Sequence, residues 1–208
     1  MKNLLVEFVG TLFLVTVIGL TVIAPGDAGS MAPLAIGATL MVMVYAGGPI
    51  SGGHYNPAVT LAVWLRGKCA TKDVAPYMVA QILGAVVAAL IVGFCKTDAN
   101  VTAKTVDVGR ALLVEVLFTF ALCYVVLNVA TSKKSSGNSY FGLAIGLTVM
   151  AGAYAGGAIS GGAFNPAVAV GISMMGLSAF GNIWIFLAGN FLGGALAAFV
   201  YKTANPDE

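Results

Sequence analysis

AGGPISGGHYNPAV at residues 46–59 returns as AGGAISGGAFNPAV at residues 155–168, and long apolar stretches flank both copies. The similarity extends beyond the motif at the same offset of 109 residues, because Gly84 is matched by Gly193. The chain therefore contains one unit written twice. Membrane proteins with such repeats commonly place their substrate site at the interface between the two units, near the bilayer midplane. The repeats are predicted at residues 1–97 and 109–203 of a single domain, residues 1–208.

The composition is that of an integral membrane protein. The 208 residues are 59% hydrophobic and only 9% charged, whereas a soluble globular domain is roughly 25% charged. The formal net charge of +2 and the lack of a long Lys or Arg run argue against nucleic acid as a partner. Three cysteines without CxxC spacing support neither a zinc site nor a disulfide framework. They are expected to be small buried apolar residues: Cys69, Cys95 and Cys123.

Six stretches approach the roughly 20 apolar residues that a helix needs to cross a bilayer. They lie at about residues 4–24, 32–48, 74–94, 108–130, 140–156 and 181–201. The first contains Glu7, which is foreign to a secretory signal peptide, so it is interpreted as a membrane helix. Two further helical stretches, residues 57–66 and 166–176, are too short to cross and are predicted to be half-helices.

Three spans per repeat make the second repeat enter the membrane from the opposite side, so the two half-helices should point at each other. With both termini in the cytoplasm, seven basic residues lie inside and three outside, in agreement with the positive-inside rule. The inside set is Lys2, Arg66, Lys68, Lys72, Lys133, Lys134 and Lys202. The outside set is Lys96, Lys104 and Arg110. The expected location is a cell membrane, either a plasma membrane or a bacterial inner membrane.

The Ser-Gly-Gly segments are expected to be non-helical. Non-helical backbone is tolerated within a membrane only where protein buries it or where it lines a water-filled cavity. Extended strands at residues 51–55 and 160–164 would turn carbonyl acceptors towards one path. Asn56 and Asn165 are then expected at the N-caps of the half-helices, with a proline at each first helical position. Each side-chain oxygen would accept from its own half-helix and leave the NH₂ donors free for a passing solute. The two positive dipole ends would repel a cation.

Two Asn-Pro-Ala turns, each after Ile-Ser-Gly-Gly, lie in an inverted repeat of six spans. With these motifs the chain resembles the aquaporin and aquaglyceroporin family, the major intrinsic proteins, over nearly its whole length. The resemblance implies an all-α membrane fold, a right-handed bundle of six transmembrane helices and two re-entrant half-helices. It also implies a passive channel with one pore in each subunit of a homotetramer, surrounded by membrane lipid. Water and small uncharged solutes would be the cargo, and no cofactor would be needed.

The resemblance assigns roles to residues of this chain. The pore motifs would be Asn56, Pro57, Ala58, Asn165, Pro166 and Ala167. Backbone carbonyls would line the path at Gly52, Gly53, His54, Gly161, Gly162 and Ala163. The carboxylates of Glu7 and Glu115 would hold the backbone donors of the re-entrant loops; a proton relay and exposure at a helix end are the alternatives. His54 is the only histidine, so no metal site is expected.

The outer constriction departs from the family pattern. Most members carry an arginine directly after the second Asn-Pro-Ala, and the glycerol branch usually continues with Arg-Asp, where this chain has Val168 and Ala169. The implied constriction consists of Ile36, Ala153, Gly162 and Val168. These residues are small or aliphatic, so the pore is predicted to be wide and apolar and to pass water plus glycerol, urea, ammonia or metalloid hydroxides. A shifted loop that brings Tyr45 or Tyr154 into the ring would narrow it.

Three other functional classes compete with a channel. A secondary transporter normally needs an intramembrane coupling site, and no Asp, Lys or Arg lies within the spans away from their ends. A structural, closed-pore member of the same family would share every motif described above. An enzyme is not supported, because no nucleophile–base pair, metal cluster or phosphate-binding motif is present.

Overall fold

Eight α-helices make up the computed structural model, which describes all of residues 1–208. The six long helices are α1 (Lys2–Val22), α2 (Ala32–Ser51), α4 (Thr71–Cys95), α5 (Val108–Val126), α6 (Phe141–Ser160) and α8 (Ile183–Ala204). The two short ones are α3 (Pro57–Leu65) and α7 (Pro166–Met174). A π-helical segment, Leu127–Thr131, extends α5, and short 3-10 turns lie at Gly29–Met31, Lys133–Ser135 and Phe180–Asn182.

The all-α membrane fold predicted from the sequence is confirmed, since six helices are long and apolar enough to cross a membrane and two are half-helices. The main difference concerns α2 and α6, which continue to Ser51 and Ser160, past the predicted ends. Each helix ends where the next residue, Gly52 or Gly161, adopts a left-handed conformation with φ of 92° or 100°. Glycine takes this conformation without steric cost, so it marks the true end of the helix.

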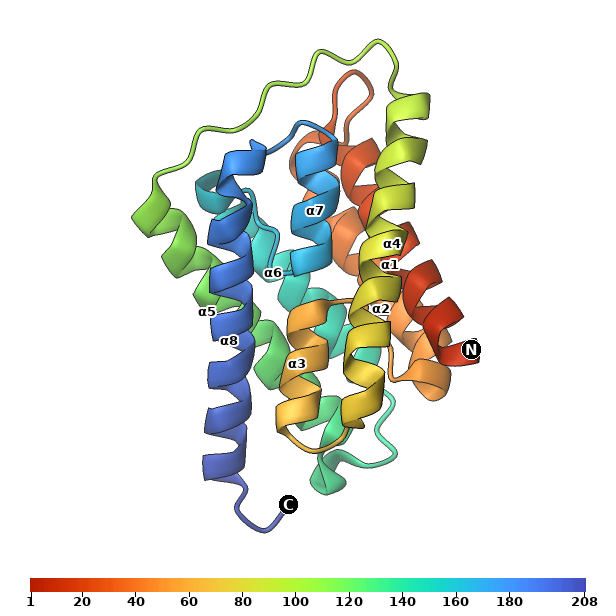
Figure 1. Ribbon diagram of the computed structural model, residues 1–208, viewed down its shortest axis with the longest axis vertical. Coiled ribbons are helices and arrows are strands. Elements are labelled where there is room, and N and C mark those ends of the chain that lie inside the picture. The colour runs from red at the N-terminus through yellow and green to blue at the C-terminus, as the bar shows by residue number, and fades with distance from the viewer.

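The two repeats pack their helices in the same way. α1 packs against α4 in the first repeat, α5 packs against α8 in the second, and α2 and α6 pack against each other across the repeats. Figure 1 shows α3 and α7 end to end in the middle of the bundle, with α7 above and α3 below. The half-helices therefore approach each other at the centre of the molecule, where an Asn-Pro turn begins each of them.

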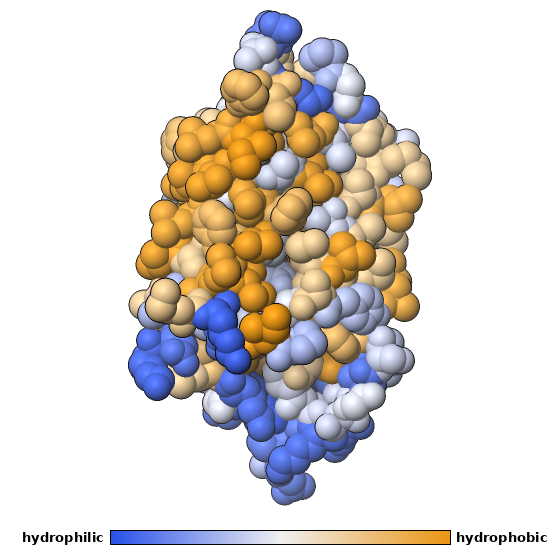
Figure 2. Space-filling view, turned by 90° about the vertical axis from the view of Figure 1, so that its right-hand side faces the viewer, coloured by the Kyte–Doolittle hydropathy of each residue, from blue (hydrophilic) through white to orange (hydrophobic).

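The outside of the bundle is apolar between two polar ends. Figure 2 shows an orange belt across the middle of one face and blue patches at its upper and lower ends. Large exposed hydrophobic side chains include Leu5, Phe13, Leu83, Leu90, Leu113, Leu117 and Leu192. Such a belt suits the hydrocarbon core of a bilayer, where apolar side chains face lipid tails instead of water.

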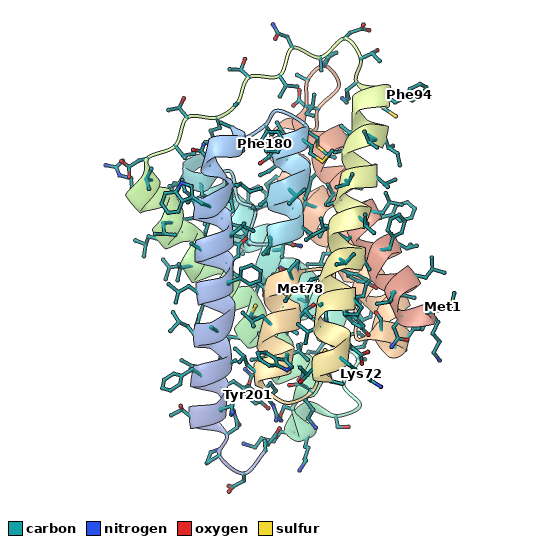
Figure 3. All side chains as sticks on the ribbon, in the orientation of Figure 1. Met1, Lys72, Met78, Phe94, Phe180 and Tyr201 are labelled. Carbon is teal, nitrogen blue, oxygen red and sulfur yellow. The ribbon has the colours of Figure 1, made fainter.

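The two ends of the bundle are distinct. In Figure 3, Lys72 and Tyr201 lie towards the end at which the C-terminus emerges, and Phe94 and Phe180 lie towards the opposite end. We call the first the terminal end. The second is called the loop end, because the long connection of residues 96–107 crosses it (Figure 1).

Close contact between helices depends on glycine at a few positions. A Cβ on Gly84 of α4 would lie 2.5 Å from the Phe8 carbonyl oxygen of α1, whereas a Cβ on Gly93 of the same helix would meet nothing within 4 Å. Gly84→Ala is therefore expected to push α1 and α4 apart and to destabilise the protein by about 1–3 kcal/mol, since overpacking forces the backbone to shift. Thermal denaturation in detergent checks this. Gly93→Ala is the control, and equal melting temperatures for the two variants would contradict the packing explanation.

Candidate functional site

The two Asn-Pro turns start the half-helices at the centre of the bundle. The Asn56 side-chain oxygen accepts from the Ala58 N–H at 2.8 Å, and the Asn165 oxygen accepts from the Ala167 N–H at 2.9 Å. Both asparagines have an extended backbone, with φ of −158° and −160°, and a proline follows each of them. This is the N-capping that the sequence predicts. It directs the positive dipole ends of α3 and α7 towards the centre.

The amide groups of the same asparagines link the two repeats. Asn56 Nδ2 donates to the Phe164 carbonyl oxygen at 2.9 Å, and Asn165 Nδ2 donates to the Tyr55 carbonyl oxygen at 2.8 Å. The expectation that both N–H donors of each amide stay free for a solute is wrong for one of the two, because a carbonyl of the opposite loop lies within reach. One N–H of each side chain remains for the cavity that both asparagines line.

The backbone that leads into each half-helix is not an extended strand. Gly53 and Tyr55 have φ of 62° and 49°, and Gly162 and Phe164 have φ of 67° and 49°, all in the left-handed region. The strands predicted for these segments are therefore wrong, because the chain turns from the end of a long helix back into the bundle within a few residues. A positive φ is energetically unfavourable for residues with bulky side chains such as Tyr55 and Phe164. Both residues are only 1% exposed, so the surrounding packing holds them in this conformation.

A buried carboxylate from α1 holds the first of these loops. Glu7 Oε1 accepts from the Ser51 hydroxyl at 2.7 Å and from the His54 N–H at 3.0 Å. Glu7 Oε2 accepts from the Tyr55 N–H at 2.6 Å and from Gln81 Nε2 at 2.8 Å. Four donors surround this carboxyl group, so each of its oxygens accepts two hydrogen bonds.

Glu115 of α5 makes the equivalent contacts in the second repeat. Its Oε1 accepts from the Ser160 hydroxyl at 2.7 Å and from the Ala163 N–H at 3.0 Å. Its Oε2 accepts from the Phe164 N–H at 2.8 Å and from Asn190 Nδ2 at 2.7 Å. Each glutamate thus contacts the loop immediately before an N-cap asparagine, as a loop-supporting role requires.

A cavity of about 380 Å³ runs past both asparagines. Its lining includes the four residues of the predicted constriction: Ile36, Ala153, Gly162 and Val168. It also includes most residues that are predicted to offer carbonyls: Gly53, His54, Gly161, Gly162 and Ala163. The structure therefore brings the predicted constriction, both asparagines and most of the predicted carbonyl residues to one continuous space.

The remaining predicted residues lie beside or behind this cavity. Gly52 lines a second cavity at the terminal end, and His54 and Val126 line both cavities, so the two adjoin. The prolines and alanines of the two motifs are buried in the first turns of the half-helices and do not line the cavity: Pro57, Ala58, Pro166 and Ala167. The loops and the two asparagines thus line the cavity, and the prolines and alanines of the two motifs lie behind them.

The class of the protein follows from a family comparison. The family described as "Major intrinsic protein" matches residues 1–201. The chain belongs to the major intrinsic protein family. Members of this family are passive membrane channels and not enzymes, and the six apolar helices make this major intrinsic protein a multi-pass membrane protein.

Similar proteins carry channel names. The chain is 36% identical, over 218 aligned positions and 100% of both chains, to "Glycerol uptake facilitator protein-like 6" of Lactiplantibacillus plantarum. It is 37% identical to "Probable aquaporin TIP2-2" of Oryza sativa subsp. japonica, over 97% of this chain and 86% of that protein. Among solved structures, the aquaglyceroporin from Plasmodium falciparum matches with a TM-score of 0.82 and 22% identity, covering 99% of this chain and 97% of that one. At that identity the structural match shows the fold alone.

Neither tyrosine considered for the predicted constriction lines the cavity of this major intrinsic protein. Tyr45 and Tyr154 are exposed side chains outside the cavity lining. The Tyr45 hydroxyl instead donates to the Ser139 carbonyl oxygen at 3.1 Å. Neither tyrosine therefore joins the small and aliphatic residues of the predicted constriction in the cavity lining.

Two basic residues have positions that sequence reasoning missed. Lys104, counted only as an outside charge, lines the cavity. Arg66, counted only as an inside charge, is buried at the end of α3 and forms an ion pair with Glu208 at 3.0 Å. The hydrogen bond from the Ser132 hydroxyl contributes most to lowering the pKa of Glu208 to about 2. No spacing in the sequence connects these partners, since each contact joins segments far apart in the chain.

Proposed function

We propose that this major intrinsic protein is a passive channel for water and small uncharged solutes, such as glycerol, urea, ammonia or metalloid hydroxides, with a wide and apolar outer constriction. The observation that carries the proposal is that Ile36, Ala153 and Val168 share one cavity with Asn56 and Asn165. The names of two relatives, a glycerol uptake facilitator and an aquaporin, support the same class of solutes.

The proposed route has two filters of different chemistry. At the outer ring, Ile36, Ala153 and Val168 present only carbon side chains, so a solute is selected there by its size and by backbone carbonyls. At the centre, the remaining amide N–H of Asn56 and of Asn165 donates to an oxygen of the solute. The N-terminal ends of both half-helices carry partial positive charge at this point, which disfavours a cation.

The proposal includes the orientation of the protein, its oligomeric state and its membrane. We place the terminal end in the cytoplasm. Seven of the ten basic residues belong to the segments predicted at this end, and the positive-inside rule puts the end with more Lys and Arg in the cytoplasm. The protein works as a homotetramer in a plasma membrane or a bacterial inner membrane, with one pore in each subunit. Glu7 and Glu115 support the pore loops, and no metal or cofactor takes part.

Stopped-flow light scattering on proteoliposomes tests the function. The rates for water, glycerol and urea are all expected to exceed those of protein-free liposomes. A high water rate with complete rejection of glycerol and urea would contradict the wide constriction. Negligible flux from well-folded protein would favour a closed-pore structural role, and saturable, gradient-coupled uptake would favour a transporter.

A tryptophan in the ring should close the channel. Ala153 of α6 is partly buried and lines the cavity, whereas Ala151 of the same helix is exposed on its outer side. Ala153→Trp is expected to lower glycerol and urea flux to the background of protein-free liposomes and water flux at least about tenfold, because pore diameter limits entry. Ala151→Trp adds the same bulk towards lipid and should transport like the wild type. Undiminished glycerol flux through the Ala153 variant would place the route elsewhere.

A further inference from the structure

The connection of residues 96–107 brings a lysine to the mouth of the cavity. The backbone N–H of Lys104 donates to the Leu177 carbonyl oxygen at 3.1 Å, and a single β-bridge pairs Lys104 with Ser178. These contacts tie the connection to the segment that follows α7. Figure 1 shows the connection crossing the loop end from α4 to α5. The backbone of Lys104 is thus held in place in the middle of an otherwise irregular segment.

The side chain of Lys104 ends on α6. Its Nζ donates to the Gly157 carbonyl oxygen at 3.0 Å. Gly157 lies in the last turn of α6, at the negative end of the helix dipole, where a cation is stabilised. A Cβ at Gly157 would meet nothing within 4 Å, so the space next to the Gly157 Cα is open.

The ammonium group therefore lies just outside the apolar ring. Gly157 follows Ala153 by four residues, which is one helical turn or about 6 Å along α6, and both residues line the cavity. Among all the residues that line this cavity, Lys104 is the only Asp, Glu, Lys or Arg. The one ion pair of the chain joins Arg66 and Glu208, so no carboxylate neutralises Lys104.

We propose that Lys104 is a specificity-determining residue of this channel, whose ammonium group supplies the fixed positive charge that Val168 does not provide at the outer constriction. The inference rests on the proposed channel function and deepens it. The carbon side chains of the ring carry no charge, so at this ring a small organic cation the size of urea is rejected only if a charge beside the ring repels it. One N–H of the ammonium group donates to the Gly157 carbonyl oxygen, and this contact holds the charge beside the ring.

Urea and guanidinium form a matched pair for the test, because they have the same planar shape and differ in charge. In proteoliposomes, the wild type is expected to pass urea and to exclude guanidinium. Lys104→Met should raise guanidinium influx about tenfold or more and leave urea influx within twofold, since a unit charge at roughly 10 Å with an effective dielectric of about 20 has an effect of that size. Lys104→Arg should restore exclusion.

The controls separate this inference from the channel function. Arg110→Met removes a charge from the same end of the bundle but outside the cavity lining, and it should behave like the wild type. Guanidinium influx that stays at the wild-type level in Lys104→Met, or that rises equally in Arg110→Met, would overturn the role of Lys104 while urea flux still supports the channel. Absence of both water and urea flux in the folded wild type would instead overturn the channel function and, with it, this inference. If Lys104→Met does not elute as a single species, Lys104→Gln takes its place in the same measurement.

Discussion

Replacement of Val168 by arginine is expected to reduce glycerol and urea permeability at least about tenfold, a change of about 1.4 kcal/mol in the barrier, while water continues to pass. Val168 is 3% exposed and lines the cavity in the first turn of α7, three residues after Asn165. A guanidinium group in that place both narrows the ring and adds donors that bind water strongly. Stopped-flow measurements of the three permeabilities in one proteoliposome preparation give the ratio directly.

Val168→Met serves as the matched control for this experiment, because methionine adds length without charge or donors. If narrowing alone matters, the two variants should lose glycerol flux equally; if the donors matter, only the arginine variant should favour water strongly. Glycerol flux through Val168→Arg at the wild-type level would show that the ring around Val168 and Ile36 is not the narrowest part of the route.

Replacement of Glu115 by glutamine is expected to destabilise the protein by about 3 kcal/mol or more and to reduce the flux of every solute. The amide NH₂ would replace an oxygen that now accepts two hydrogen bonds, so it would face two donors instead. Buried donors that lose an acceptor cost about 1–3 kcal/mol each. The effect would extend to the centre, because the Phe164 carbonyl oxygen is the acceptor for Asn56. Thermal denaturation in detergent and water permeability of the same preparation measure both effects.

Asp107→Asn provides the comparison within the same helix. Asp107 is the N-cap of α5 and is exposed, and its carboxylate accepts from the Arg110 N–H at 2.9 Å. Asparagine caps a helix about as well as aspartate, so the same chemical change should alter the melting temperature very little here. Equal melting temperatures for the Glu115 and Asp107 variants would show that the buried contacts of Glu115 contribute little to stability.

The fold can be predicted from the sequence alone because the features that determine it lie within short stretches of the chain. The length and hydropathy of each span decide that it crosses the membrane, and the Asn-Pro pair decides where a half-helix begins. Glu7 and Glu115 were recognisable because a carboxyl group within an apolar span needs partners. Even so, the sequence predicts ends of α2 and α6 that are too early, since the first glycine pair of each motif stays helical and only Gly52 and Gly161 leave the helix.

The parts that sequence reasoning missed all depend on which segments meet in space. One N–H of Asn56 is used because the opposite loop turns the Phe164 carbonyl oxygen towards it, and that orientation requires positive φ at Phe164, which residue propensities disfavour. Lys104 belongs to a polar connection without any motif, and its position depends on a bridge to Ser178. Contacts of this kind carry no periodicity, so only the folded chain reveals them.

The crossed hydrogen bonds from Asn56 to Phe164 and from Asn165 to Tyr55 require the two copies to lie in opposite orientations. A polypeptide of half the length would leave its own amide donor and its own carbonyl acceptor unmatched. It would satisfy both only by pairing with an identical molecule inserted upside down, which requires one gene product to adopt two orientations in the same membrane. A single chain that carries both copies brings the two orientations together in one insertion event, and the two copies need not be identical, as His54 and Ala163 at matching positions show.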